Sequence, residues 1–302
     1  MKTGHYVSVD GIRTHYFEAG AEHRGKRPSV LLLHTGEFGG CAEFTWEHNL
    51  TALGKEFHVL APDHLGFGLT DKVFDFGGQF NRRITHIRRF IDTMCVGSVH
   101  VIGASMSGGL SLAVAARQRP DWPFASLTVC SGGGEAPDNE YRKVLNSYDG
   151  TREHMRRIVE AIFYNPKYAK DDAYIERRVE MAALPGAWEA TQAARFRAPF
   201  RQASAGKGER DNIDYAAIKV PTLVFAGRHD PLRNPGYTDA FVPKIPNAQL
   251  HMFENAAHLG NIECADEFNA RTLAFLNSIS PLARDRQHFE DSHASLVAAH
   301  GS

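Results

Sequence analysis

The chain has 302 residues, 43 % of them hydrophobic, and a formal net charge of -1 at pH 7. That is enough apolar material for one substantial core, while the balanced charge excludes a basic surface built for nucleic acid or for an anionic membrane. The longest apolar runs, such as Val30–Leu33, are far shorter than the ~20 residues of a membrane span, and Met1–His5 lacks the apolar stretch of a secretory signal.

The first part of the chain is expected to form strands. Tyr6–Asp10 and Ile12–Phe17 flank Asp10-Gly11, a hairpin turn signal. Ser29–His34 is short and apolar with turn residues on both sides, as in a strand buried on both faces of a mostly parallel sheet. Similar runs recur at Phe57–Ala61, Val99–Gly103, Leu127–Cys130, Thr222–Ala226 and Gln249–Phe253.

Stretches with a helical pattern alternate with these strands. This alternation predicts the α/β class, with a sheet that helices cover on both faces. The expected helices are Glu43–Leu53, Phe80–Cys95, Met106–Arg119, Tyr237–Ile245 and Ala265–Ile279.

The alternation is interrupted between residues 135 and 219, where no buried strand is evident. Arg152–Phe163 and Asp171–Ala183 are rich in charge and in helix formers, and their amphipathic pattern predicts helices packed over another part of the protein. A lid over the C-terminal edge of the sheet would cover the place where α/β sheets bind ligands. A long surface excursion is the alternative. The expected division is 1–134 and 220–280 for the core, 135–219 for a helical cap and 281–302 for a polar tail.

The segment Val99–Gly109 has the features of a nucleophile turn between a strand and a helix. A serine on such a sharp turn needs small neighbours two residues away on either side. Gly103-x-Ser105-x-Ser107 meets this need, with serine where the usual pattern has a second glycine. Ser107 is a rival nucleophile in the frame shifted by two residues, but the strand ends at Gly103, so Ser105 is preferred. A serine that only caps a buried helix is the non-catalytic alternative.

A serine nucleophile needs a base, and the base needs an orienting acid. Asp230 follows the strand Leu223–Ala226, and His258 follows the strand that ends at Phe253, in the order Ser, Asp, His. Read alone, Asp230 could equally be a turn aspartate before proline. The alternatives left open by the order are His229 and His251 for the base, and Asp138 and Glu254 for the acid.

An oxyanion hole requires two backbone N–H donors close to the nucleophile. Met106 at the start of the helix would supply one. The glycine-rich loop His34–Gly40 would supply the other, and Gly36 is the expected donor. The same loop is not a phosphate loop, because no G-K-[ST] follows it.

Together these segments resemble the α/β-hydrolase family over nearly the whole chain, and within it the meta-cleavage-product hydrolases. These enzymes cleave a C–C bond in vinylogous 1,5-diketone acids formed by aromatic ring fission. The resemblance implies the α/β-hydrolase fold, with a mostly parallel eight-stranded sheet, flanking helices and a helical cap. It rests on the loop after His34, Ala61–Gly68, Ser105-Met106, Ile175–Glu180, Gly227–Asp230, Ala257-His258 and Ala265–Asn269.

The resemblance also assigns substrate-binding residues. Arg178 occupies the place of a cap arginine that binds the dienoate carboxylate, and a guanidinium forks onto a carboxylate with two hydrogen bonds. A solvated helix arginine is the alternative. Ala104 stands where the subfamily has asparagine, Ser107 where it has glycine, and Leu259 where it has tryptophan. Since these positions line the pocket of the subfamily, the exact substrate does not follow.

The expected function is therefore a serine-dependent hydrolase of a small, carboxylate-bearing molecule, cleaving a C–C bond. A carboxylesterase or lactonase with the same triad is one alternative, and a non-catalytic ligand-binding protein on this fold is another. Neither a metal nor an organic cofactor is expected. The four scattered cysteines lack C-x-x-C spacing, which favours the reducing cytoplasm, and a homodimer is the expected assembly.

Overall fold

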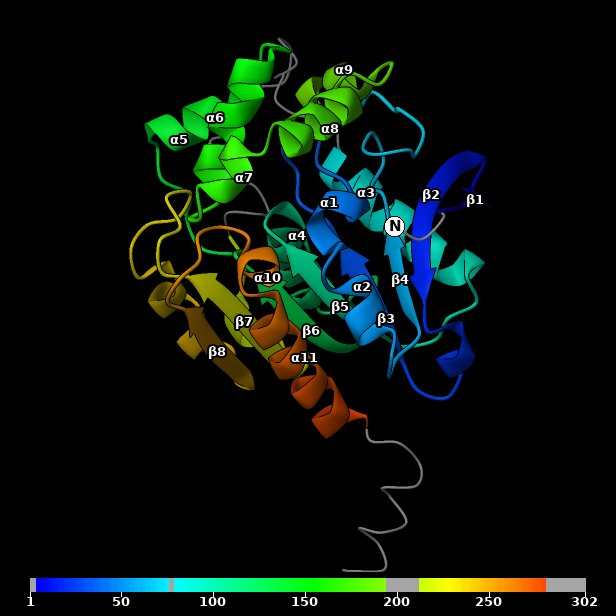
Figure 1. Cartoon of the computed structure of the whole chain (residues 1–302). Coiled ribbons are helices and arrows are strands. Elements are labelled where there is room, and N and C mark those ends of the chain that lie inside the picture. The colour runs from blue at the N-terminus through cyan, green and yellow to red at the C-terminus, as the bar shows by residue number, and fades with distance from the viewer. Residues whose placement is uncertain (1–3, 76–78, 194–211, 281–302) are drawn as a thin grey trace, which may run out of the picture.

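A computed structural model describes residues 4–75, 79–193 and 212–280. Its eight strands form one sheet in the order β1-β2-β4-β3-β5-β6-β7-β8, in which β1 and β2 are antiparallel and the neighbours from β4 onwards are parallel (Figure 1). This confirms the α/β class and the mostly parallel sheet. The strands are β1 (His5–Val9), β2 (Ile12–Ala19), β3 (Ser29–Leu33), β4 (Val59–Pro62), β5 (Val99–Ala104), β6 (Phe124–Cys130), β7 (Thr222–Gly227) and β8 (Ala248–Phe253).

Strand β3 shows why the central strands read as continuous apolar runs. Leu31 and Leu33 pack into the cluster on one face of the sheet, while Val30 and Leu32 pack into the cluster on the other. Successive side chains of a strand point to opposite faces, so both kinds of position must be apolar when helices cover both faces. The pairing of Leu33 with Gly103 brings the end of β3 beside the end of β5.

Helices cover both faces of the sheet (Figure 1). On one face, α3 and α4 contribute Phe90 and Leu112 to the first apolar cluster. On the other, Trp46 of α1 and Phe268 of α11 belong to the second cluster. The helices of the core are α1 (Ala42–Trp46), α2 (Leu50–Leu53), α3 (Gln79–Thr93), α4 (Met106–Ala115), α10 (Gly260–Glu263) and α11 (Ala265–Ile279).

Three of the expected helices are wrong in extent or type. The helix expected over Glu43–Leu53 is divided into α1 and α2, because the buried amide of Asn49 donates hydrogen bonds to Asn261 O and Asn269 Oδ1. The helix expected over Met106–Arg119 ends at Ala115.

The region Tyr237–Ile245 forms two 3₁₀ turns in place of the expected α-helix. These turns are η3 (Tyr237–Ala240) and η4 (Val242–Lys244). Pro243 stands at the start of the second turn and has no backbone N–H, so a continuous helix would lack a hydrogen bond there. Two further 3₁₀ turns are η1 (Ala21–His23) and η2 (Tyr215–Ala217).

Five helices occupy the described part of the segment between β6 and β7, and they lie over the sheet at the top of Figure 1. The apolar cluster of the first four helices includes Met155, Ile158 and Ile175, together with Phe38 from the loop region after β3 and Phe44 from α1. The segment therefore packs directly on that loop region. The helices are α5 (Glu140–Asn146), α6 (Arg152–Ile162), α7 (Lys167–Lys170), α8 (Asp172–Ala182) and α9 (Ala187–Ala193).

Part of the expected cap and the whole of the expected tail fall beyond the described residues. These parts are residues 194–211 and 281–302, respectively. Within the described residues, no helix is both long and apolar enough to cross a bilayer.

Candidate active site

Ser105 lies on a sharp turn between β5 and α4. Its backbone has φ 52° and ψ -110°, a conformation that L-residues adopt rarely and that functional sites often hold. Its N–H donates to Cys130 O at 2.8 Å, which fixes the turn to the neighbouring strand. A side chain at Gly103 would lie 2.6 Å from Ser107 O, so the turn closes only over glycine at that position.

The expected base and acid both lie beside this serine. His258 Nε2 is 2.6 Å from Ser105 Oγ, and His258 Nδ1 is 2.7 Å from Asp230 Oδ2. Because an ionised carboxylate can only accept, Nδ1 carries the ring proton and donates to Asp230. Nε2 is then free to accept the hydroxyl proton of Ser105. Serine, histidine and aspartate thus form one continuous hydrogen-bonded chain.

The loops after β7 and β8 are held against each other by their backbones. A Cβ at Gly227 would collide with the carbonyl of Ala257, so glycine permits this close approach. Arg228 N–H donates to Phe253 O at 2.9 Å, and His229 N–H donates to Ala256 O at 3.1 Å. These contacts set the spacing between the acid on one loop and the histidine on the other.

Asp230 is held in its ionised form. Burial would raise the pKa of its carboxyl, but Coulombic attraction and a hydrogen bond from His258 outweigh burial and lower the pKa below its usual value. Its second oxygen accepts the N–H of Leu232 at 2.9 Å. The carboxylate is therefore charged and fixed in orientation at neutral pH.

The alternative bases and acids make other contacts. His229 stacks on Tyr164 with ring centroids 4.1 Å apart, and His251 lies 3.0 Å from Glu267. Glu254 is paired with Arg228 at 2.8 Å. Asp138 is exposed to solvent.

The expected oxyanion donors are in contact with each other. A Cβ at Gly36 would lie 2.9 Å from Cβ of Met106, so the loop after β3 rests directly on the first residue of α4. Gly36, Ser105 and Met106 are all half-buried, whereas the other residues of the loop 34–40 are buried. These three residues therefore form a partly accessible patch that buried residues surround.

Ser107 has a role that the sequence reasoning missed. Its side chain is fully buried, and its hydroxyl donates to the carbonyl oxygen of His34. The same Oγ accepts the Nε2–H of His64 at 2.7 Å, while the backbone N–H of His64 donates to His34 Nε2 at 2.9 Å. The only signal in the sequence was the departure from glycine at position 107.

Burial keeps both of these histidines neutral. It lowers the pKa of His34, and it lowers the pKa of His64 well below its usual value. His34 accepts at Nε2, so its proton is on Nδ1, which donates to Thr35 O at 2.6 Å. These bonds attach the loop after β3 to the base of the nucleophile turn.

Arg178 lies on α8 with no exposed surface, so the solvated-helix alternative is wrong. Its Nη2 donates to Glu37 Oε1 at 2.6 Å, and its Nη1 donates to the Tyr174 hydroxyl at 3.2 Å. From the sequence, Glu37 is only a departure from the more glycine-rich loop of the subfamily and has no assigned role, although it is a lone carboxylate in an otherwise uncharged loop. The guanidinium therefore already holds a carboxylate that belongs to the protein.

The two other expected substrate-binding residues are buried in apolar clusters. Ala104 is fully buried in the cluster that includes Ile102, Cys130 and Phe225, beneath the end of β5. Leu259 belongs to the cluster that the helices α5–α8 share with the core. Leu259 thus joins the histidine loop to those helices.

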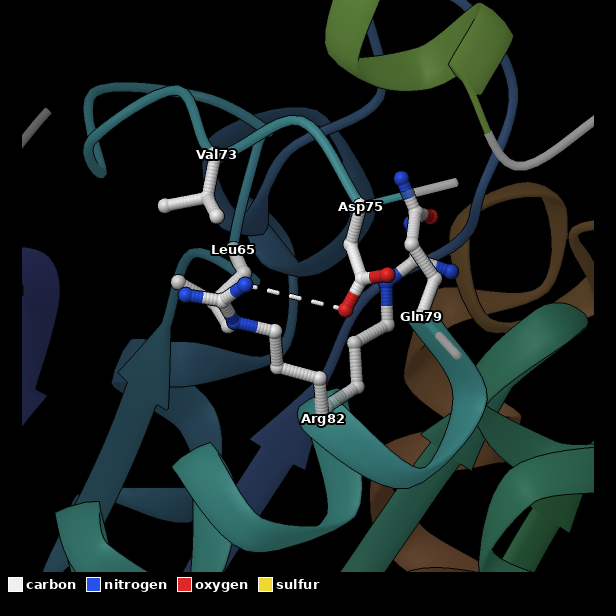
Figure 2. Close-up of a pocket in the computed structure, with 6 residues that line it drawn as sticks. Leu65, Val73, Asp75, Gln79 and Arg82 are labelled. Carbon is white, nitrogen blue, oxygen red and sulfur yellow. Dashed lines mark hydrogen bonds and ion pairs between the residues drawn. The ribbon is translucent and has the colours of Figure 1, made fainter. Parts of the chain in front are cut away.

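A small pocket lies at the N-terminus of α3 (Figure 2). Arg82 Nη1 is 3.6 Å from Asp75 Oδ2, and Figure 2 marks this ion pair with a dashed line. Arg83 connects this pocket to the site, because its guanidinium donates to Met106 Sδ at 3.2 Å. The lining residues are Leu65, Val73, Asp75, Gln79, Arg82 and Arg83.

Residues 28–265 match the family described as the alpha/beta hydrolase fold. The 2-hydroxy-6-oxo-6-(2'-aminophenyl)hexa-2,4-dienoic acid hydrolase of Metapseudomonas resinovorans is 30 % identical over 280 residues, covering 92 % of each chain. The 2-hydroxymuconate semialdehyde hydrolase of Pseudomonas sp. strain CF600 is 29 % identical, covering 90 % of this chain and 93 % of its own.

Solved structures show the same fold. A serine hydrolase involved in carbazole degradation is 28 % identical with a TM-score of 0.74, covering 91 % of this chain and 98 % of its own. A meta-cleavage product hydrolase from Pseudomonas fluorescens IP01 has a TM-score of 0.78 at 24 % identity, with the same coverage.

Proposed function

This chain belongs to the alpha/beta hydrolase family, and on that premise we propose that it is a serine hydrolase that cleaves a C–C bond in a ring-fission product. The substrate class is that of a vinylogous 1,5-diketone acid. Support comes from the relatives named as hydrolases of 2-hydroxy-6-oxo dienoic acids and of 2-hydroxymuconate semialdehyde. The observation that carries the proposal is the hydrogen-bonded chain from Ser105 through His258 to Asp230.

The proposed reaction begins with a proton shift in the substrate. Moving the proton of the 2-hydroxyl group to the carbon next to the distal ketone gives a diketone whose C–C bond can break. His258 then accepts the hydroxyl proton of Ser105, or of a water held in its place, and the oxygen attacks the distal ketone. Asp230 stabilises the imidazolium that forms.

The tetrahedral intermediate carries negative charge on the former ketone oxygen. We assign the N–H groups of Met106 and Gly36 to hold this charge, since both residues belong to the partly accessible patch that includes Ser105. Collapse breaks the C–C bond. The fragment that carried the 2-hydroxyl group takes a proton from His258 and leaves as the 2-hydroxypentadienoate-like acid. When Ser105 is the nucleophile, the other fragment remains as an ester on Ser105 until a water, deprotonated by His258, attacks the ester and releases the second acid and the serine hydroxyl. When water attacks directly, the second acid forms in the same collapse, so either route consumes one water.

The test compares two substrates on the same enzyme. A ring-fission dienone acid, followed by the loss of its visible absorbance, should be turned over with a kcat/KM at least tenfold above that of a simple aryl ester. Turnover of the ester with none of the dienone would reject the C–C bond assignment and favour the carboxylesterase or lactonase alternative. Ser105→Ala is the control in both assays.

We also propose that residues 135–219 act as a cap over the site, that the enzyme works in the cytoplasm and that it is a homodimer. Contact between the cap and the histidine loop supports the first point, because His258 N–H donates to Ile162 O at 3.1 Å. Four free cysteines, two of them buried, fit a reducing compartment. Light scattering after gel filtration tests the dimer.

A further inference from the structure

The loop after β3 is enclosed between the nucleophile turn and the cap helix α8. Below, Gly36 rests on Met106. Above, a Cβ at Gly39 would lie 2.6 Å from the carbonyl oxygen of Arg178, so the backbone of the loop touches the backbone of α8. Phe38 is buried between these layers, with its ring 5.2 Å from that of Tyr148.

One ion pair crosses the contact between the loop and α8. Glu37 follows Gly36 directly, and its carboxylate accepts from the Arg178 guanidinium at 2.6 Å. The side chains are 5 % and 0 % exposed, so water does not screen their attraction. Burial alone would raise the pKa of Glu37, but the attraction of Arg178 outweighs it and lowers the pKa, so the carboxylate is charged at neutral pH.

This pairing changes what Arg178 offers to a substrate. An arginine that receives a substrate carboxylate must present an uncompensated positive charge and open N–H groups. Here Nη2 binds Glu37 and Nη1 binds Tyr174, and the ring of Phe44 lies 5.4 Å from the guanidinium carbon. Among the described residues Nε has no hydrogen-bond partner, but a single buried N–H does not provide the two-pronged contact of an open guanidinium. A second carboxylate at this guanidinium would be placed next to Glu37, and like charges repel strongly in a buried site.

We propose that the buried Glu37–Arg178 pair holds the loop of Gly36 in the position needed for the oxyanion hole, so that Arg178 is a positioning residue and not the receptor of the substrate carboxylate. The inference rests on the proposed hydrolase, because it concerns the oxyanion hole of that reaction. The cap thereby acts on the chemical step, and not only on substrate access.

The central experiment measures kcat and KM of Glu37→Gln and Arg178→Met on two substrates. One is a ring-fission dienone carboxylate, and the other is a neutral aryl ester. Releasing the loop misplaces an N–H donor, and such a displacement costs on the order of 10- to 100-fold in kcat. We expect this loss on both substrates alike, with KM changed less than about threefold, and a double variant no worse than the poorer single one.

A tetrahedral adduct separates positioning from a general loss of structure. An aryl boronic acid bonds to Ser105 and places an oxygen in the oxyanion hole, so both variants should bind it more weakly by about the factor lost in kcat. Binding of the acid product should stay unchanged. The matched control is Arg177→Met, which removes the neighbouring arginine of α8 and its exposed 2.7 Å pair with Glu43. This control should retain wild-type kcat.

Two results would overturn the proposal. The first is a rise of tenfold or more in KM for the carboxylate substrate alone in Arg178→Met, with wild-type kcat on the ester. The second is wild-type kcat and wild-type boronate affinity in Glu37→Gln, which is nearly isosteric and keeps an acceptor, and so carries the test if Arg178→Met does not fold. If Ser105→Ala is inactive while Glu37→Gln is fully active, only the positioning role is rejected. If Ser105→Ala is itself active, the proposed reaction with Ser105 as nucleophile is rejected.

Discussion

Two serine–histidine pairs lie on the same turn, two residues apart, and they differ in almost everything except distance. Ser105 Oγ is 2.6 Å from His258 Nε2, and Ser107 Oγ is 2.7 Å from His64 Nε2. The first serine is half-buried and the second is fully buried. Behind His258 stands Asp230, whereas His64 Nδ1 has no hydrogen-bond partner among the residues that the structure describes.

The direction of the hydrogen bonds separates the two pairs. The Ser105 hydroxyl donates to a histidine nitrogen that is open to a proton, as a general base must be. The Ser107 hydroxyl donates to the carbonyl of His34 and accepts from His64, so that histidine already carries its proton on the facing nitrogen. A short serine–histidine distance therefore marks a nucleophile in one case and a structural bond in the other.

The largest expected difference between the two pairs follows from removing the hydroxyl of Ser105. Ser105→Ala should lower kcat by about 10⁴- to 10⁶-fold, because triad members act as a unit. The measurement is single-turnover kinetics on the dienone and on an aryl ester. Activity within tenfold of wild type would show that the nucleophile lies elsewhere, with Ser107 as the first candidate.

The acid behind His258 is the next difference to test. Asp230→Asn keeps the size of the side chain but removes the charge that orients and stabilises the imidazolium, and kcat should fall by about 10³- to 10⁴-fold. Glu254→Gln is the control, since that exposed carboxylate pairs with Arg228. Equal losses in the two variants would contradict the assignment of the acid.

Removing the buried hydroxyl should have a smaller effect of a different kind. Ser107→Ala leaves the His34 carbonyl and the His64 N–H without their partner, which costs about 1 to 3 kcal/mol in the free energy of unfolding. We expect kcat to fall only about 3- to 10-fold, through a looser oxyanion loop. Urea unfolding and steady-state kinetics measure the two effects.

The same helix offers a matched control for Ser107. Ser111 is also fully buried, and within the described residues its hydroxyl has no hydrogen-bond partner. Ser111→Ala should therefore leave both stability and kcat near wild type. A similar loss in both variants would mean that the bonds of Ser107 contribute nothing specific.

The buried histidines around Ser107 also predict a dependence of stability on pH. Burial lowers the pKa of His34, His64, His86 and His100, the last two to about 4, so these rings are neutral in the folded protein. Above the usual value of 6.5 both folded and unfolded chains are neutral there. As the pH falls from 6.5 towards 4, the unfolded chain takes up protons first, and stability is lost.

Urea unfolding at pH 7.5 and at pH 5 checks this expectation. The free energy of unfolding should be lower at pH 5, and His64→Gln should reduce the difference between the two values. A protein that is equally stable at both pH values would show that these histidines are not held neutral by burial.

Local pattern was enough for much of the fold. Apolar runs of four to six residues between turn signals predicted the strands, because a strand buried on both faces must be apolar at successive positions. Of the three expected helices that are wrong, those over Glu43–Leu53 and Tyr237–Ile245 fail for reasons that local pattern does not carry well. In the first a buried asparagine bonds to residues more than 200 positions away, and in the second a proline lacks its N–H.

The sequence by itself determined the family and the order Ser105, Asp230, His258, since each of these follows a recognisable strand and parallel strands end at the same edge of a sheet. Only the tertiary structure decided how Ser107 and Arg178 are used. Ser107 meets His34 from 73 positions away, and Arg178 meets Glu37 from 141 positions away. A buried polar group takes whichever partner the folded chain brings within about 3 Å, and that partner is set by packing and not by the neighbouring sequence.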